Sequence, residues 1–211
     1  MDKLSKRYID EIVEWNKKFN LTGLKTPEDI KAKLYDDSLN ISKATGLINP
    51  LNMIDIGCGA GFPGIPIKIE FPDIELALVD SVAKKIEFVN HVISMLELKR
   101  TSAICARAEE LGQDDRYREK YDLCVSRAVA QMNVLCEYCL PFVKTGGLFI
   151  AQKGPDIENE LKVAASAIKI LGGHIKDNIK VDSGFLVVIE KIEYTPAEYP
   201  RRVGLPSKRP L

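Results

Sequence analysis

The chain has 211 residues, of which 30 are Lys or Arg, 30 are Asp or Glu and 45% are hydrophobic. This composition excludes a disordered, collagenous or membrane-spanning protein and predicts one compact unit, which we expect to be a monomer. The net charge of zero argues against a nucleic-acid-binding surface over the whole molecule, but it leaves a local basic patch open. The first residues carry no apolar signal segment, so we expect a cytoplasmic protein.

The first fifty residues are predicted to be helical. Thr26 is a suitable N-cap and Pro27 a suitable first residue for a second helix, which fades before Gly46. The preceding helix is indicated by apolar residues at helical spacing, namely Leu4, Tyr8, Ile9, Ile12, Val13 and Phe19. We assign residues 1–50 to an N-terminal helical extension.

From residue 51, short apolar runs alternate with helical stretches, which favours a mainly parallel sheet covered on both faces. A final pair, 173–181 and 184–192, has no helix between its strands and predicts an antiparallel hairpin. The remaining strands are expected at 51–56, 75–80, 101–106, 121–126 and 147–152, with helices at about 64–70, 82–97, 131–140 and 156–171. The α/β domain thus spans 51–194, and the Pro-rich, basic residues 195–211 are expected to form an extended arm.

A glycine-rich turn follows the first strand of the predicted sheet. Gly57, Gly59 and Gly61 permit positive φ and a close approach of a ligand to the backbone. Asp80 ends the next strand, at a distance in sequence that suits a carboxylate bound to ribose hydroxyls. Together these residues predict a cofactor that contains adenosine.

The spacing of the glycines helps to choose among such cofactors. A dinucleotide fingerprint requires glycine at position 62, where Phe62 stands, and Pro63 and Pro66 remove amide donors that a pyrophosphate would use. S-adenosylmethionine contains no phosphate, and its sulfonium cation suits a nearby acid such as Asp55. We therefore favour S-adenosylmethionine, while a purely structural glycine turn stays open.

Three more polar residues are expected at the same edge of the sheet. Glu109 is either a contact to the adenine or a solvated loop acid. Arg127 either holds a carboxylate, phosphate or base of the substrate or pairs with a nearby acid. Lys153 is a positioning candidate near the substrate, although an exposed lysine is the simpler interpretation.

No metal site is expected. Cys136 and Cys139 form a Cys-x-x-Cys pair, but His91 and His174 are distant in sequence. The five cysteines are an odd number and are scattered, which predicts reduced thiols.

Motifs spread over nearly the whole chain occur in a specific order and spacing: Trp15-Asn16, Asn20-Leu21-Thr22, Asp37-Ser38-Leu39, Asp55 through Gly64, Asp80-Ser81 with Lys84-Lys85 and Phe88, Arg107-Ala108-Glu109, Ser126-Arg127-Ala128, Lys153-Gly154, and a closing run from Tyr199 to Leu211. In these motifs the sequence resembles the glucose-inhibited-division-type methyltransferases of small-subunit ribosomal RNA, which methylate N7 of a guanine. The resemblance implies a Rossmann-like fold of the class I methyltransferases, S-adenosylmethionine as methyl donor and 16S ribosomal RNA, or the small ribosomal subunit, as partner.

The resemblance also implies cofactor contacts at Gly57, Phe62, Ala108, Glu109 and Arg127, with Asp80 on the ribose. One position departs from the family. Leu34 stands where the family often has a histidine three residues before the Asp-Ser pair, so a role for that histidine does not transfer.

Guanine N7 has a lone pair and no proton, so this reaction needs no general base. Catalysis then rests on in-line positioning, and no catalytic acid or base is expected in the chain. RNA is expected to bind the basic arm through Arg201, Arg202, Lys208 and Arg209.

Three rival functions remain open. A methyltransferase of the same fold acting on a small molecule or protein would not need the basic arm. A nucleotide-binding dehydrogenase would bind NAD instead of S-adenosylmethionine, and a ribosome-assembly factor would bind the cofactor without turnover.

Overall fold

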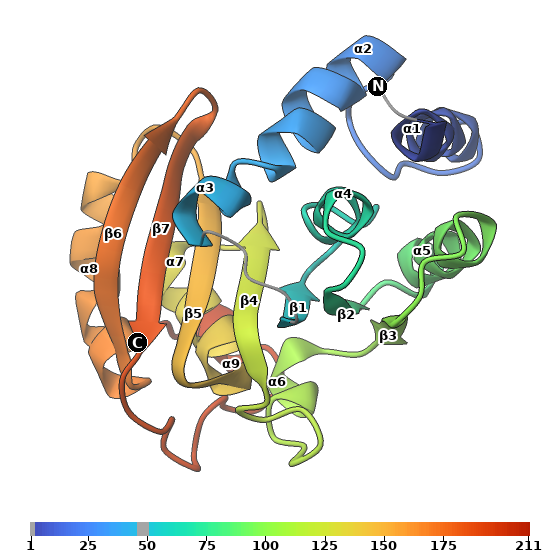
Figure 1. The fold of residues 1–211 in the computed structure, drawn as a ribbon. Coiled ribbons are helices and arrows are strands. Elements are labelled where there is room, and N and C mark those ends of the chain that lie inside the picture. The colour runs from blue at the N-terminus through green and yellow to red at the C-terminus, as the bar shows by residue number, and fades with distance from the viewer. Residues whose placement is uncertain (1–2, 46–50) are drawn as a thin grey trace.

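The computed structural model describes residues 3–45 and 51–211. Its centre is a seven-stranded sheet in the order β3-β2-β1-β4-β5-β7-β6 (Figure 1). The strands are β1 (Asn52–Ile56), β2 (Glu75–Asp80), β3 (Thr101–Cys105), β4 (Tyr121–Arg127), β5 (Val143–Lys153), β6 (Gly173–Val181) and β7 (Gly184–Lys191). The first five strands pair in parallel, and β7 pairs antiparallel with both β5 and β6. The parallel sheet and its final hairpin are confirmed.

Helices cover both faces of the sheet (Figure 1). One apolar cluster joins the sheet to α1 (Lys3–Asn16), α4 (Gly64–Glu70) and α5 (Ala83–Met95). The other joins it to α7 (Met132–Cys139) and α8 (Glu158–Ile170). Because both faces are covered, the central strands are nearly continuous runs of buried residues. Strand order reverses at β1, between its neighbours β2 and β4, and such a point is where open sheets of this type bind ligands.

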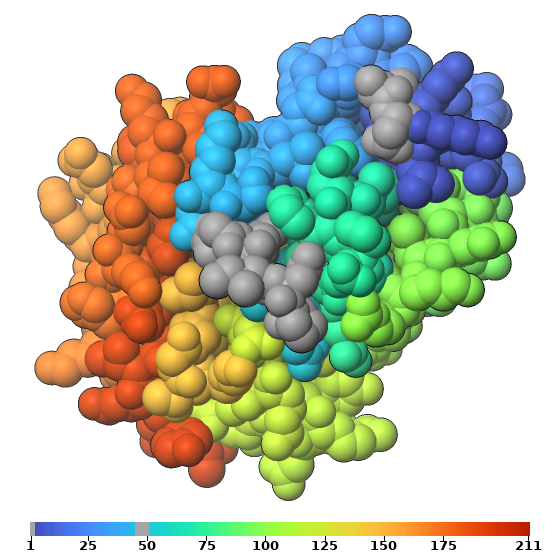
Figure 2. All heavy atoms as spheres, in the orientation of Figure 1, coloured from blue at the N-terminus to red at the C-terminus, as the bar shows by residue number. Residues whose placement is uncertain are grey.

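The N-terminal helices share the first apolar cluster, so they pack on the sheet domain itself. Tyr8 is fully buried, lies with its ring centroid 5.3 Å from that of Phe62, and donates a hydrogen bond from its hydroxyl to the carbonyl of Ala60 (2.7 Å). In Figure 2 the blue N-terminal residues lie directly against α4 and α5. The N-terminal segment therefore supports the glycine turn that follows β1.

Two expected helices differ from the prediction, the first in where it ends and the second in its continuity. The first ends at Asn16, whose side chain accepts from the amides of Leu21 and Thr22 and donates to the carbonyl of Leu24, and so organises the loop instead. The second begins with the expected Thr26 cap but divides into α2 (Pro27–Ile30), a π-helical turn η1 (Lys31–Asp36) and α3 (Ile41–Thr45). The predicted fading before Gly46 concerns a position outside the described residues.

The C-terminal residues differ from the expected extended arm. They fold back on the domain and include the short helix α9 (Leu205–Lys208), which contacts α7. Arg118 donates from its guanidinium to the carbonyls of Thr195 and Tyr199, both at 2.7 Å. These bonds join residues about eighty positions apart, and no local sequence pattern indicates them.

Candidate functional site

The turn after β1 has the left-handed conformations that its glycines predict. The φ angles are +74° at Gly57, +58° at Gly59 and +98° at Gly61. A Cβ at Gly57 would lie 2.3 Å from Cγ2 of Val129, so a larger residue would displace the wall of the site. A Cβ at Gly59 would meet no atom within 4 Å, so the backbone there has open space above it.

Five amides of this turn, those of residues 57–59, 61 and 62, are already engaged within the protein. Gly57 and Cys58 donate to the carbonyl of Val79, at 2.8 and 3.0 Å. Gly61 and Phe62 both donate to the carbonyl of Cys58, at 2.7 and 2.9 Å. A phosphate-binding loop needs free amides, so this turn is poorly suited to a pyrophosphate.

The start of α4 is also poorly suited to a pyrophosphate. Pro63 has no amide hydrogen, and the amide of Gly64 donates to Oδ2 of Asp55 at 2.8 Å. Asp55 is completely buried, and burial raises the pKa of its carboxyl to about 7, with the Gly64 hydrogen bond opposing this and the charge of Asp80 adding to it. Its Oδ1 has no hydrogen-bond partner among the described residues. Asp55 therefore fixes the junction of turn and helix from inside.

Asp80, at the end of β2, connects the turn to a cavity of about 280 Å³. Its Oδ2 accepts from the amide of Gly59 (3.0 Å), and its Oδ1 accepts from the amide of Val82 (2.9 Å). Lys85 Nζ lies 3.6 Å from Oδ2. Each carboxylate oxygen has two lone pairs, so Asp80 keeps acceptor capacity for a ligand hydroxyl.

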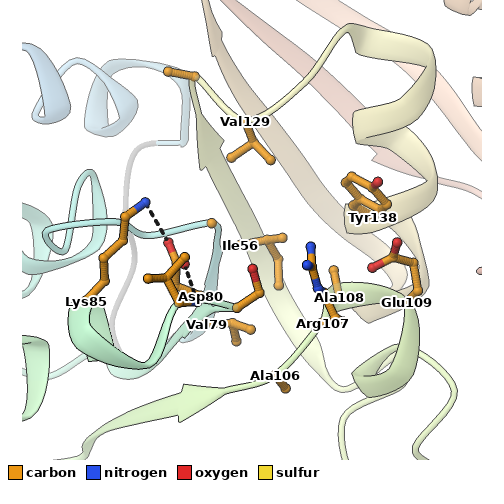
Figure 3. Close-up of a pocket in the computed structure, with 14 residues that line it drawn as sticks. Ile56, Val79, Asp80, Lys85, Ala106, Arg107, Ala108, Glu109, Val129 and Tyr138 are labelled. Atoms are coloured by element: carbon orange, nitrogen blue, oxygen red, sulfur yellow. Dashed lines mark hydrogen bonds and ion pairs between the residues drawn. The ribbon is translucent and has the colours of Figure 1, made fainter. Parts of the chain in front are cut away.

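The cavity lies at the carboxyl ends of β1, β2 and β3. In Figure 3, Asp80 and Lys85 lie on one side of it and Glu109 and Tyr138 on the other. Apolar side chains, among them Ile56, Val79, Val82 and Val129, supply much of the lining between them. An apolar lining with a few fixed polar groups is typical of a small-molecule site.

Four of the predicted cofactor residues line this cavity: Gly57, Asp80, Ala108 and Glu109. Gly59 and Gly61 shape the turn beside it, and Phe62 is buried against Tyr8 instead. Sequence reasoning named Lys85 within a motif but gave it no role, and it missed Val129 and Tyr138. Val129 directly follows the Ser-Arg-Ala motif and could have been found from the sheet edge, whereas Tyr138 lies inside α7 and gives no local signal.

Arg127 lies outside the first cavity, in a second one of about 190 Å³ at the ends of β4 and β5. Its Nη2 donates to the carbonyl of Lys33 (2.6 Å) and lies 3.2 Å from Oδ2 of Asp37, and its Nη1 donates to the carbonyl of Leu34 (3.3 Å). Burial lowers the pKa of the Arg127 guanidinium, and the charge of Asp37 opposes that shift. Arg127 thus holds η1, which includes Leu34, over the sheet edge.

Lys153 lines the same second cavity. Its ammonium group pairs with Glu160 at 2.6 Å and donates to the carbonyl of Ala130 at 2.9 Å. Gln152 donates from its amide nitrogen to the carbonyl of Asp37 (2.8 Å), and the hydroxyl of Ser183 donates to the carboxylate of Asp37. The two cavities have Ala128 in common, so a group bound in one lies next to a group bound in the other.

The four basic residues predicted to bind RNA have different surroundings. Arg201 makes a bidentate pair with Glu137, with contacts of 2.9 and 2.6 Å, whereas Arg202, Lys208 and Arg209 are exposed. Lys191, the last residue of β7 and close to this segment in sequence, is fully buried against Glu119 (3.0 Å).

The Cys-x-x-Cys pair lies in the interior. Cys136 and Cys139 are buried free thiols in α7. Residues 3–45 and 51–211 contain no group of three or more side chains that could hold a metal ion. No helix within those ranges is long and apolar enough to cross a membrane.

The residues of the first cavity fit S-adenosylmethionine. The engaged amides disfavour a phosphate, while the Asp80 carboxylate, the open space over Gly59 and the apolar wall suit an adenosine without one. Solved structures share this fold. A putative S-adenosylmethionine-dependent methyltransferase from Methanococcus maripaludis superposes with a TM-score of 0.60 at 18% identity, over 92% of this chain and 96% of that one. A mutant of MtNAS in complex with S-adenosylmethionine gives a TM-score of 0.61 at 17% identity, over 90% of this chain and 73% of that one.

Sequence comparison extends the likeness beyond the fold. The ribosomal RNA small subunit methyltransferase G of Alkaliphilus oremlandii is 49% identical over 97% of this chain and 88% of its own length. The protein of the same name from Desulforamulus reducens is 47% identical over the same shares of the two chains. The family model described as GidB, rRNA small subunit methyltransferase G, matches residues 1–183. The chain therefore belongs to the GidB family of rRNA small subunit methyltransferases.

Proposed function

We propose that the protein transfers a methyl group from S-adenosylmethionine to N7 of a guanine in 16S ribosomal RNA, in the cytoplasm. The observation that carries this proposal is the pair of cavities that meet at Ala128, one suited to a phosphate-free adenosine cofactor and the other lined by the cations Arg127 and Lys153. The homologues, named for ribosomal RNA methylation, support the class of substrate.

In the first cavity, Gly57 and Ala108 would contact the adenosine through the backbone, Asp80 would hold the ribose hydroxyls, and Glu109 would accept from the adenine amino group. When bound, S-adenosylmethionine supplies an electrophilic methyl group on a sulfonium centre. The wall residues Val82 and Val129 would exclude water from the space beside it.

In the second cavity, Arg127 and Lys153 would orient the target guanine or its phosphate. Guanine N7 carries no proton, so neither residue has to act as a base. Their contribution is to keep N7 in line with the methyl group, and such orientation can lower a barrier by about 7–11 kcal/mol. Both cations are themselves fixed, Arg127 by Asp37 (3.2 Å) and Lys153 by Glu160 (2.6 Å), so they are already arranged before RNA arrives.

RNA would reach this edge over the exposed basic residues Arg202, Lys208 and Arg209. Phosphate contacts of this kind give affinity that falls with salt and does not depend on sequence.

The test is transfer of labelled methyl from S-adenosylmethionine to small ribosomal subunits that lack the modification, compared with their deproteinised RNA. Strand scission specific for 7-methylguanine locates the product. We expect label at one guanine in at least one of the two substrates. Absence of label from both, with cofactor binding verified by calorimetry, would contradict the ribosomal function and favour a small-molecule or protein substrate.

A further inference from the structure

Residues 195–211 form the C-terminal segment. Hydrogen bonds and an ion pair join this segment to the two helices that form one wall of the cofactor cavity. Arg201 donates from Nε (2.9 Å) and Nη2 (2.6 Å) to the carboxylate of Glu137 in α7, and its own amide donates to the same carboxylate at 2.8 Å. The amide of Gly204 donates to Oε1 of Glu109 at 2.9 Å. Glu109 belongs to α6 (Ala108–Leu111).

Both acceptors are part of the wall or adjacent to it. Glu109 lines the cavity and is only 6% exposed, and Glu137 is completely buried next to Tyr138, which also lines the cavity. Burial raises the pKa of the Tyr138 phenol, the charge of Glu109 raises it further, and a hydrogen bond with Ser207 of the C-terminal segment opposes both. Glu109, Tyr138 and the segment thus form one connected group, of which Figure 3 shows the cavity side.

The C-terminal segment is seated closely along α6 and the turn that follows. A Cβ at Gly112 would lie 2.9 Å from Cγ of Pro200, so this close approach favours glycine. Gln113 donates from its side-chain amide to the carbonyls of Ala197 (3.2 Å) and Pro200 (2.9 Å). Close packing and hydrogen bonds, among them those of the Arg118 guanidinium, therefore fix the segment, and Arg201 adds an ion pair.

We propose that the docked C-terminal segment holds Glu109 and Tyr138 in their cofactor-binding positions, which makes Arg201 a positioning residue for the cofactor rather than a ligand of RNA. The proposal rests on the proposed function, because it takes S-adenosylmethionine as the ligand. It also changes the role that sequence reasoning gave to one of the four basic residues of the segment.

The physical reason lies in the burial of Glu137. Without Arg201, the Glu137 carboxylate has no cationic partner among the described residues. A buried carboxylate without a partner must gain water or a proton, which favours movement of α7 or release of the segment. Release breaks the bond from Gly204 to Glu109, and the Glu109 side chain then loses its fixed orientation. Both changes disturb the wall opposite Asp80 and weaken cofactor binding.

The test uses two neighbouring arginines with opposite expectations. Arg201→Ala is expected to raise the dissociation constant for S-adenosylmethionine about tenfold in calorimetry, which corresponds to about 1.4 kcal/mol. The same variant should leave the salt slope of binding to deproteinised small-subunit RNA unchanged. Arg202→Ala, the matched control in an exposed position, should leave cofactor affinity within about twofold and reduce the salt slope by about 0.7–0.9.

Arg201→Lys, which keeps the charge but not the two-point contact, should recover part of the cofactor affinity. If Arg201→Ala does not fold, the double variant Arg201→Met with Glu137→Gln removes the buried charge as well and should still bind the cofactor more weakly than wild type.

Wild-type cofactor affinity in every folded Arg201 variant, or a salt slope reduced by Arg201→Ala, would overturn the proposal. A wild-type protein that does not bind S-adenosylmethionine would instead contradict the proposed function.

Discussion

The two cavities at the carboxyl edge of the sheet are built in different ways. The first lies at the ends of three adjacent parallel strands, and five amides of its glycine turn donate to acceptors in the turn itself or in β2. The second depends on Asp37, which contacts Arg127 of β4, Gln152 of β5 and Ser183 of the β6–β7 turn. The lining of the first cavity therefore comes from the sheet edge and from α5, α6 and α7, whereas the lining of the second is completed by Asp37 of the N-terminal segment.

The largest effect is expected from Lys153→Met, which should impair the second cavity and leave the first unchanged. Lys153→Met removes a cation from the second cavity and leaves Glu160 bonded to the amide of Met132 (2.7 Å). We expect methyl transfer to fall about 100-fold in kcat/KM, because a misplaced substrate loses orientation, while cofactor affinity stays within about twofold. Calorimetry and single-turnover transfer measure the two quantities. A comparable loss of cofactor affinity would show that the cavities do not work separately.

Asp80→Ala should instead impair the first cavity. It removes the proposed ribose acceptor and also the bond that holds Gly59 (3.0 Å). Loss of a hydrogen bond to a charged group costs about 1.5–3 kcal/mol, so cofactor affinity should fall about 10- to 100-fold without loss of the fold. Asp73→Ala, which replaces an exposed acid just before β2, serves as the control. Unchanged cofactor affinity in Asp80→Ala would remove the ribose assignment.

The exposed basic residues should affect neither cavity directly. Replacing Arg202, Lys208 and Arg209 by Ala is expected to lower the salt slope of RNA binding by about 2–3, because each phosphate that a protein neutralises adds about 0.7–0.9 to that slope. Cofactor affinity should not change. Binding to small-subunit RNA at several salt concentrations checks this, and an unaltered slope would exclude the segment as the phosphate-binding surface.

A more modest effect concerns the buried Asp55 carboxyl behind the glycine turn. Its pKa is raised to about 7 by burial, so the folded protein holds a proton there that the unfolded chain has lost above about pH 4. The free energy of unfolding should therefore fall between about pH 4 and pH 7, and Asp55→Asn should lose about 2–4 kcal/mol less over that range than wild type. Urea unfolding of both proteins at about pH 4 and pH 7 measures this difference. An equal fall in the free energy of unfolding of the two proteins would show that Asp55 keeps an ordinary pKa.

The sequence predicted the features that depend on local patterns and missed those that depend on contacts between distant residues. The strands, the crossover helices and the positive φ of Gly57 and Gly61 are local consequences of apolar period and glycine spacing, and the structure confirms them. The π-turn that Arg127 holds and the pair between Arg201 and Glu137 join residues 93 and 64 positions apart. Basic residues in a Pro-rich tail indicate an exposed arm, and no local signal shows that one of them pairs with a buried acid.

One spatial relation is central to the proposed reaction: the methyl group of the cofactor must face the second cavity across Ala128. A crystal structure of the protein with bound S-adenosylmethionine would test this relation. We predict ribose hydroxyls on Asp80, adenine beside Glu109, and the methyl group directed past Ala128 toward Arg127 and Lys153. A cofactor whose methyl group points away from Ala128, or one bound by Arg127 and Lys153 themselves, would contradict the proposed reaction.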